Sequence, residues 1–327
     1  MLTAKVWPSL MIVVLVASAA TSSKISESGG KRTRTHQWFW KSALPPPPSF
    51  FAGNKPPENL PGISGGTNIQ QKLPADPPST PPYFVSLFDP ARNIPFYSAY
   101  KVTPAQATAI ETHRRKDFNW RNPKDAKGQG IPVDGAYKEA ITKYKQPLSR
   151  GHMNPSGINS FDQNFMKATF TLTNAAPQFE ASNSDLWQTF ETRIRTYAKS
   201  TCGNSKRGGT LYLLTGTSDF GLKPGSAGKP VQDTTIPLPF TTTTFSKGIK
   251  LVTPRAVWTA GCCEWNGKAE SFAVMSNNQK DKSLLYQTEM SVADLEVLLT
   301  AKGSLGVKLF PGAAKCGDTS SKIILPP

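Results

Sequence analysis

The sequence predicts an α+β fold, because strand-like and helix-like segments are mixed along the chain without the repeated β-α-β order of a parallel sheet. Helical spacing occurs at 183–199 and at 291–303, where Ser291 is a typical N-cap and Gly303 a typical stop. Five segments rich in β-branched and aromatic residues are predicted strands or hairpins: 83–102, 166–174, 210–216, 251–260 and 270–276.

The first of these segments, YFVSLFDPARNIPFYSAYKV, predicts a β-hairpin, because two strand-like runs flank the turn sequence DPARN. The helix at 183–199 has an apolar face that is expected to pack on a sheet. Four residues at helical spacing make up this face: Leu186, Phe190, Ile194 and Tyr197.

The sequence divides into three parts. Residues 1–20 have the charged start, short apolar run and small-residue end of a secretory signal peptide, with a retained signal anchor as the alternative. Residues 21–82 contain KRTRTH, LPPPPSF and LPADPPSTPP, a basic and Pro-rich composition that predicts a disordered arm. Structured sequence begins near Tyr83, so residues 83–327 are expected to form one domain.

The chain is strongly basic, with 38 Lys and Arg against 22 Asp and Glu and a net charge of +16. Such an excess concentrates polyanions at the protein surface, and nucleic acid is the first candidate partner. A merely soluble basic protein has the same composition, so charge alone defines no site. The apolar run at 10–16 is too short to span a bilayer, and no stable membrane association is expected.

Secretion would expose the cysteines to an oxidising compartment, which favours disulfides. The chain has four: Cys202, Cys262, Cys263 and Cys316. Adjacent cysteines rarely bridge each other, so Cys262 and Cys263 are each expected to pair with one of the two distant cysteines, which leaves two connectivities. A zinc site is the alternative, but the sequence has no C-x-x-C or paired-histidine spacing.

A second face of the 183–199 helix is defined by residues at steps of four: Asn183, Trp187, Glu191 and Arg195. An amide, a carboxylate and a guanidinium on one face suit the binding of a divalent cation and a phosphate. A purely structural interpretation is also available, in which Asn183 caps the helix and Glu191 forms an ion pair with Arg195.

The stretch LSRGHMNPSG at 148–157 adds His152 to this set. Phosphodiester hydrolysis needs a base for the attacking water, a group that stabilises charge on the phosphate, and one that assists the departing oxygen. A neutral imidazole, a guanidinium and Mg²⁺ suit these three tasks. The other histidines, His36 in the arm and His113 in a predicted helix, lie in no nucleophile motif, which disfavours a serine or cysteine hydrolase.

Three motifs in order, RGHMNPSG, FTLTNAAPQ and NSDLWQTFETRIR, resemble the DNA/RNA non-specific endonucleases of the ββα-metal (His-Me finger) class. That family's pattern is Asp-Arg-Gly-His-x-x-Pro, then Thr-Asn-x-x-Pro-Gln, then Asn-x-x-x-Trp-x-x-x-Glu-x-x-x-Arg. The resemblance covers about 83–320 and extends to the secreted branch called endonuclease domain-containing 1, which shares a leader, an ARNIPFYSAY-like opening and a CC pair. It implies the His-Me finger (ββα-metal) endonuclease fold, with a central, mainly antiparallel sheet flanked by helices.

The resemblance implies that His152 is the general base that activates the attacking water, with Arg150 next to it. Asn174 corresponds to the family's asparagine close to the histidine, and Arg121 is the candidate for a further upstream arginine. One position departs from the pattern, because Ser149 stands where the family has the aspartate before Arg-Gly-His. Either a hydroxyl does there what the carboxylate does in the family, or that role is lost.

The resemblance also implies that Asn183 is the single protein ligand of Mg²⁺, with water and phosphate oxygens in the other positions; such a site could accept Mn²⁺. Glu191 would orient the metal-bound waters, and Arg195 would contact the phosphate. The expected function is that of a secreted, Mg²⁺-dependent endonuclease that hydrolyses DNA and RNA through phosphate contacts. The alternative, suggested by Ser149 and the basic arm, is a catalytically weakened nucleic-acid-binding or defence protein on the same fold.

Overall fold

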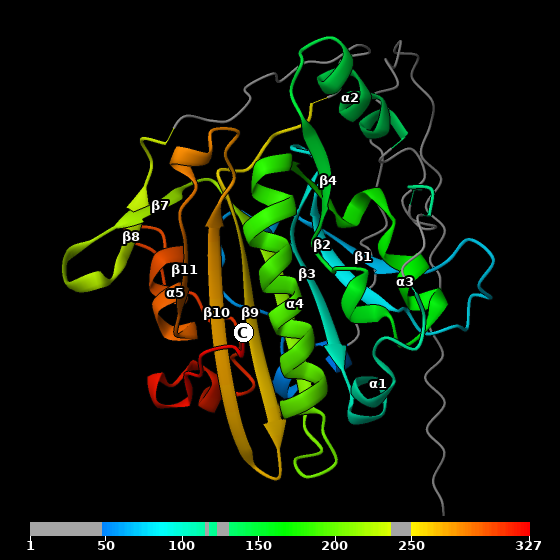
Figure 1. The fold of residues 1–327 in the computed structure, drawn as a ribbon, viewed down its shortest axis with the longest axis vertical. Coiled ribbons are helices and arrows are strands. Elements are labelled where there is room, and N and C mark those ends of the chain that lie inside the picture. Colours follow the sequence, from blue (N-terminus) through cyan, green and yellow to red (C-terminus); the bar gives the residue numbers. More distant parts are fainter. Residues whose placement is uncertain (1–47, 115–117, 123–130, 237–249) are drawn as a thin grey trace, which may run out of the picture. The chain divides into compact units, whose positions relative to one another are not determined.

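A seven-stranded sheet forms the centre of the fold, in the order β1-β2-β3-β6-β9-β10-β11 (Figure 1). The structure is a computed structural model, and it describes residues 48–114, 118–122, 131–236 and 250–327. Every strand pairing in this sheet is antiparallel, in agreement with the mainly antiparallel sheet that the family resemblance implies. Its strands are β1 (Thr67–Gln71), β2 (Phe84–Asp89), β3 (Ile94–Val102), β6 (Thr210–Ser218), β9 (Ala256–Trp265), β10 (Lys268–Asn277) and β11 (Gln287–Met290).

Two small sheets and several helices surround the central sheet. The small sheets pair β4 (Leu148–His152) with β5 (Ala175–Phe179), and β7 (Gly221–Pro224) with β8 (Pro230–Asp233). The helices are α1 (Pro104–Ala109), α2 (Ile131–Thr142), α3 (Gln163–Thr169), α4 (Gln188–Tyr197) and α5 (Val292–Leu299). In Figure 1, α4 lies along the central sheet in front of β9. Within the described ranges, no helix combines the length and the apolar character needed to cross a membrane.

Several predicted elements are confirmed, but two predicted strands are wrong in whole or in part, and the helix that follows Ser291 ends at Leu299, before the predicted stop at Gly303. The hairpin is β2 and β3, and the side chain of Ser291 caps α5 by accepting a hydrogen bond from the Asp294 N–H. The strand predicted at 166–174 is instead the end of α3 and a short turn, because Asp162 caps α3 by accepting from two N–H groups. The strand predicted at 251–260 begins only at Ala256, after Pro254, which has no N–H to donate to a ladder.

The expectation of a disordered arm up to residue 82 is wrong for residues 48–82. Strand β1 pairs with β2 along its whole length, and the side chains of Phe51 and Ile69 are buried. The prolines of this segment lie outside β1, so they bound the strand without removing any of its ladder hydrogen bonds. Residues 1–47, which include the predicted signal peptide and His36, lie outside the described residues.

The buried face of the 183–199 helix differs from the prediction at one position. Phe190, Ile194 and Tyr197 are buried as expected, but Leu186 is 38% exposed and Trp187 only 1% exposed. The helix begins with a π-helical turn, η6 (Ser182–Trp187). A π-helical turn has more residues than an α-helical turn, so residues before Gln188 point in other directions around the helix axis than α-helical spacing predicts. Trp187 therefore replaces Leu186 in the core.

The two disulfides are Cys202–Cys263 and Cys262–Cys316, which is one of the two predicted connectivities. Neighbouring residues on a strand point to opposite faces of the sheet, so Cys262 and Cys263 of β9 face opposite sides. One bridge joins β9 to the end of the helical segment that follows α4, and the other joins β9 to the C-terminal turn η11 (Ala314–Gly317). The sheet is thus covalently linked to the chain on both faces.

Candidate active site

Strands β4 and β5 and the helix that follows them form a β-β-α unit. The two strands pair antiparallel from Leu148↔Phe179 to His152↔Ala175. Asn278, at the end of β10, ties this unit to the central sheet: its Oδ1 accepts from the Phe179 N–H at 2.9 Å, and its Nδ2 donates to the Pro177 carbonyl at 2.9 Å. Asn278 is fully buried, so both hydrogen bonds are shielded from water.

A cleft of about 580 Å³ lies at this unit, and four of the predicted site residues line it. They are His152 at the end of β4, Asn183 in η6, and Glu191 and Arg195 in α4. The fold therefore brings an imidazole, an amide, a carboxylate and a guanidinium to one cleft.

The imidazole of His152 lies between two aromatic rings. Its centroid is 4.6 Å from that of Trp120 and 4.7 Å from that of Phe170, which meets it edge-on. Arg121 helps to position Phe170, because its Nη1 donates a hydrogen bond to the Phe170 carbonyl at 3.2 Å. Burial lowers the pKa of Arg121 to about 10. Arg121 does not line the cleft, so in this structure it supports the wall behind His152.

Asn174 fixes the backbone that follows His152. Its Oδ1 accepts from the Asn154 N–H at 2.8 Å, and its Nδ2 donates to the carbonyls of Asn154 at 3.0 Å and Thr169 at 2.9 Å. Its own carbonyl accepts from the Met153 N–H at 2.9 Å. Because Asn174 is fully buried, it acts on the cleft through the loop backbone.

A buried chain of polar side chains continues from Asn174 through the central sheet. Ser98 of β3 donates to Asn174 Oδ1 at 2.8 Å, and Ser98 and Ser86 of β2 share a hydrogen bond of 2.7 Å. Gln71 of β1 donates from Nε2 to Ser86 Oγ at 3.0 Å and to Thr173 Oγ1 at 2.9 Å. The loop of His152 is thus connected by hydrogen bonds to the edge strand β1.

The side chain of Arg150 is directed toward α2. It forms an ion pair with Asp134 and lies over the ring of Tyr137, 5.0 Å from the centroid. Burial raises the pKa of Asp134, but hydrogen bonds and charges from Lys138 and Arg150 outweigh burial and leave this pKa below its ordinary value. Arg150 is not among the residues that line the cleft, so this structure places it in the scaffold of β4 and α2.

Arg195 meets an acidic side chain in the cleft. Its Nε lies 3.5 Å from Glu111 Oε1, and Lys199 Nζ lies 2.8 Å from Glu111 Oε2. The hydrogen bond and charge of Lys199 lower the pKa of Glu111. A Cβ on Gly157 would lie 3.2 Å from Arg195 Nη1, so a glycine at this position leaves room for the guanidinium.

Asn183 and Glu191 provide the oxygen donors that a magnesium ion prefers. The side chain of Asn183 makes no hydrogen bond to any residue in the described ranges and lines the cleft, so its amide oxygen is accessible to a cation. Those ranges contain no group of three or more His, Cys, Asp or Glu side chains placed to hold a metal. A cation held by one amide oxygen and by waters needs no such group, and the residues present fit Mg²⁺ in that mode.

Sequence reasoning missed four ionisable residues that line the cleft: Glu111, His113, Arg114 and Glu180. His113 does not lie in a helix as predicted, because α1 ends at Ala109; its N–H donates to the Ser160 carbonyl at 3.0 Å. That contact spans residues far apart in the sequence, so no local pattern indicates it. Glu180 precedes Asn183 by three residues, and helical spacing could have placed it on the same face.

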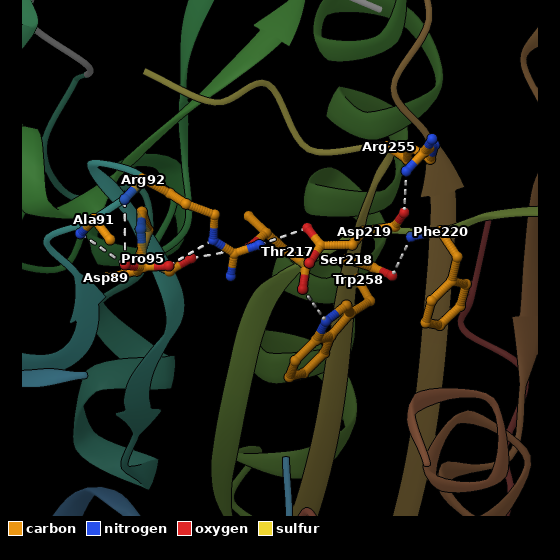
Figure 2. A network of polar contacts seen from close by, with 10 residues as sticks. All are labelled: Asp89, Ala91, Arg92, Pro95, Thr217, Ser218, Asp219, Phe220, Arg255 and Trp258. Atoms are coloured by element: carbon orange, nitrogen blue, oxygen red, sulfur yellow. Dashed lines mark hydrogen bonds and ion pairs between the residues drawn. The ribbon is translucent and has the colours of Figure 1, made fainter. Parts of the chain in front are cut away.

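A second cavity, of about 250 Å³, has a mainly apolar lining that includes Phe96 and Trp258. Figure 2 shows polar contacts beside it, in which Arg92 bridges Asp89 and Asp219. None of the predicted site residues lines this cavity. Its charged groups satisfy one another, which is the arrangement of a structural network.

Residues 64–314 match the DNA/RNA non-specific endonuclease family, a range that contains the whole cleft. The chain belongs to this family. This endonuclease-family chain is also 24% identical, over 286 residues, to the endonuclease domain-containing 1 protein of Homo sapiens. The aligned region covers 83% of this chain and 47% of that protein. The chain therefore spans about half the length of that relative.

A solved structure is similar as well. It is a crystal structure of the EndoG/EndoGI complex, and its stated subject is the mechanism of EndoG inhibition. The similarity has a TM-score of 0.48 and a sequence identity of 18%, and it covers 68% of this chain and 82% of that chain.

Proposed function

We propose that this endonuclease-family chain is a secreted, Mg²⁺-dependent enzyme that hydrolyses phosphodiester bonds of DNA and RNA without sequence preference. One observation carries the proposal: His152, Asn183, Glu191 and Arg195 line the same cleft. These are the groups that deprotonation of water, cation binding and phosphate binding require.

His152 acts as the general base. A neutral imidazole at physiological pH accepts the proton of an attacking water, and the rings of Trp120 and Phe170 restrict its orientation. Asn174 supports the same geometry through the backbone of Met153 and Asn154. The base is therefore pre-positioned by both its ring contacts and its loop.

Asn183 would hold the cation, and Glu191 would orient the waters around it. When bound, Mg²⁺ supplies positive charge that stabilises the phosphate and the departing oxygen; Mn²⁺ could replace it. Arg195 binds the phosphate, for which its planar guanidinium is suited, and in doing so exchanges the carboxylate of Glu111 for a phosphate oxygen. Recognition through phosphates explains why both DNA and RNA would be substrates.

Secretion is supported by two independent features. The first 20 residues have the layout of a signal peptide. Two disulfides in the described residues suit an oxidising compartment.

The test is cleavage of plasmid DNA and of RNA by the purified protein, with and without EDTA. We expect EDTA-sensitive cleavage of both, reduced about 10²- to 10⁴-fold in His152→Ala, the range typical of a lost general base. Imidazole added to the His152→Ala reaction should restore part of the rate. Asn204→Ala is the matched control, because Asn204 is a surface residue that does not line the cleft.

The alternative, a weakened protein that binds nucleic acid, predicts a different result in the same samples. Binding measured by fluorescence anisotropy would persist in the wild type, but no EDTA-sensitive cleavage would be seen. That outcome, or equal cleavage by wild type and His152→Ala, would contradict the proposed mechanism.

A further inference from the structure

A carboxylate that the family pattern does not include lies directly after β5. Glu180 lines the cleft together with His152 and Asn183. Both of its oxygens accept a hydrogen bond from a serine: Oε2 from Ser149 Oγ at 2.8 Å, and Oε1 from Ser184 Oγ at 3.0 Å. The two serines belong to different elements, β4 and η6, so together they fix the orientation of the carboxylate.

The position of Glu180 follows from strand and helix geometry. Ser149 pairs with Gln178 across β4 and β5, and residues two apart on a strand point to the same side, so Glu180 falls beside Ser149. The chain is helical from Glu180 onward, which places Asn183 and Ser184 on the same side one turn later. Glu180 therefore lies between the position where the family has its aspartate and the candidate cation ligand.

Two serine hydroxyls donate to the carboxylate of Glu180, one to each oxygen. Each serine hydroxyl has one hydrogen to donate, and a carboxylate has about four acceptor positions, so two remain for other donors such as water. No Lys or Arg of the described ranges forms an ion pair with Glu180, whereas Glu111 in the same cleft pairs with Lys199 and Arg195. In the part of the chain that the structure describes, hydroxyl donors alone therefore hold the Glu180 side chain.

A second observation concerns Gln178, the residue that pairs with Ser149 across β4 and β5. Gln178 is fully buried and packs against Gly151, where a Cβ would lie only 1.7 Å from Gln178 Oε1. Neither Gln178 Oε1 nor Nε2 has a hydrogen-bond partner in the part of the chain that the structure describes. Buried amide atoms of this kind are normally satisfied by ordered water or by a ligand.

We propose that Glu180, held by Ser149 and Ser184, is a positioning residue that orients the water molecules around the cation at Asn183. It supplies, from the residue after β5, the carboxylate that the family has at position 149, and the serine at that position is its hydrogen-bond donor. This proposal rests on the proposed function, since it concerns the same cation. In this proposal Glu180 compensates for the missing aspartate at position 149, so the role of the family carboxylate is retained in this chain.

The proposal is tested by exchanging the two groups. Ser149→Asp alone places a second carboxylate next to Glu180 Oε2, and two carboxylates at that distance repel and cannot both be ionised. Glu180→Ser alone removes the carboxylate. We expect each single variant to lose about tenfold or more in kcat, and the double variant Ser149→Asp/Glu180→Ser to recover most of the wild-type kcat.

Cation affinity provides a readout that does not depend on cleavage. The affinity for Mn²⁺, measured without nucleic acid by electron paramagnetic resonance, should fall about tenfold in Glu180→Gln and Glu180→Ser and recover in the double variant. Glu58→Gln is the matched control, because Glu58 is exposed and contacts Lys308 only through backbone hydrogen bonds. Thermal unfolding of each variant reports on its folding.

The outcomes separate this proposal from the proposed function. An increase in activity in Ser149→Asp alone, or unchanged Mn²⁺ affinity in Glu180→Gln, overturns the role of Glu180 even if the wild type cleaves nucleic acid and His152→Ala does not. Absence of EDTA-sensitive cleavage by the wild type overturns the proposed function, and the Mn²⁺ measurements still decide whether Glu180 acts at a cation site. Failure of the double variant to recover either quantity, with normal thermal unfolding, also contradicts the exchange.

Discussion

Replacing Asn174 with alanine tests whether the buried amide positions the loop of His152. The change removes the side-chain partner of four buried groups: Ser98 Oγ, the Asn154 N–H, the Asn154 carbonyl and the Thr169 carbonyl. At about 1 kcal/mol for each of the four lost hydrogen bonds, the free energy of unfolding should fall by about 4 kcal/mol. For a domain of this size that corresponds to a decrease of about 8 °C in Tm.

The same substitution should impair catalysis more than stability alone explains. Without Asn174, the backbone at Met153 and Asn154 is free to shift, and a displacement of about 1 Å of a catalytic group can cost about 100-fold in rate. The assay is kcat for plasmid cleavage at 25 °C, where the variant remains folded, together with Tm from calorimetry. Asn204→Ala is the control: it removes two hydrogen bonds at the surface and should cost about 1 kcal/mol with kcat unchanged. A Tm decrease under about 2 °C, or a kcat equal to that of the wild type, would refute the reasoning.

Three further predictions concern the end of the cleft that contains Arg195. Glu111→Gln removes the carboxylate that pairs with Arg195 and Lys199, so KM for DNA should fall about threefold at pH 7. Because the Lys199 hydrogen bond lowers the pKa of Glu111 from 4.5, this difference should persist down to pH 4.5 in binding assays and disappear only below it. Arg195→Ala should reduce the slope of log binding constant against log salt by about 1, and an unchanged slope would exclude a phosphate contact. Gly157→Ala brings a Cβ to 3.2 Å from Arg195 Nη1 and should lower kcat about fivefold with little change in Tm; unaltered kcat would show that Arg195 is not held there.

Much of the fold follows from local signals in the sequence. The hairpin around DPARN, the cap of Ser291 and the strands at 210–216 and 270–276 need only neighbouring residues to specify them, and the structure confirms all of them. The convergence of His152 with the Asn183 helix follows from family-like spacing within one β-β-α unit. Local pattern and short-range spacing therefore account for the centre of the site.

The features that sequence reasoning missed depend on contacts between distant segments. Strand β1 lies in a Pro-rich segment whose composition predicts disorder. Its pairing with β2, which depends on a separate segment of the chain, is what makes it a strand. Glu111 and His113 reach the cleft because their backbone N–H groups donate hydrogen bonds to Ser160. Glu111 and Ser160 are 49 residues apart in the sequence, so no local sequence pattern indicates this contact. The π-helical turn that exchanges Leu186 for Trp187 is likewise a result of packing on the sheet.

The edge strand β1 also sets a limit on how short a soluble fragment can be. A fragment that begins at Tyr83 would leave the N–H and C=O groups of β2 unpaired at the edge of the sheet, where they can pair with another copy of the chain. It would also leave Ser86 and Thr173 without the amide of Gln71. Self-association and loosening of the histidine loop are therefore expected together, since β1 both covers the edge of β2 and begins the polar chain that ends at the loop of His152.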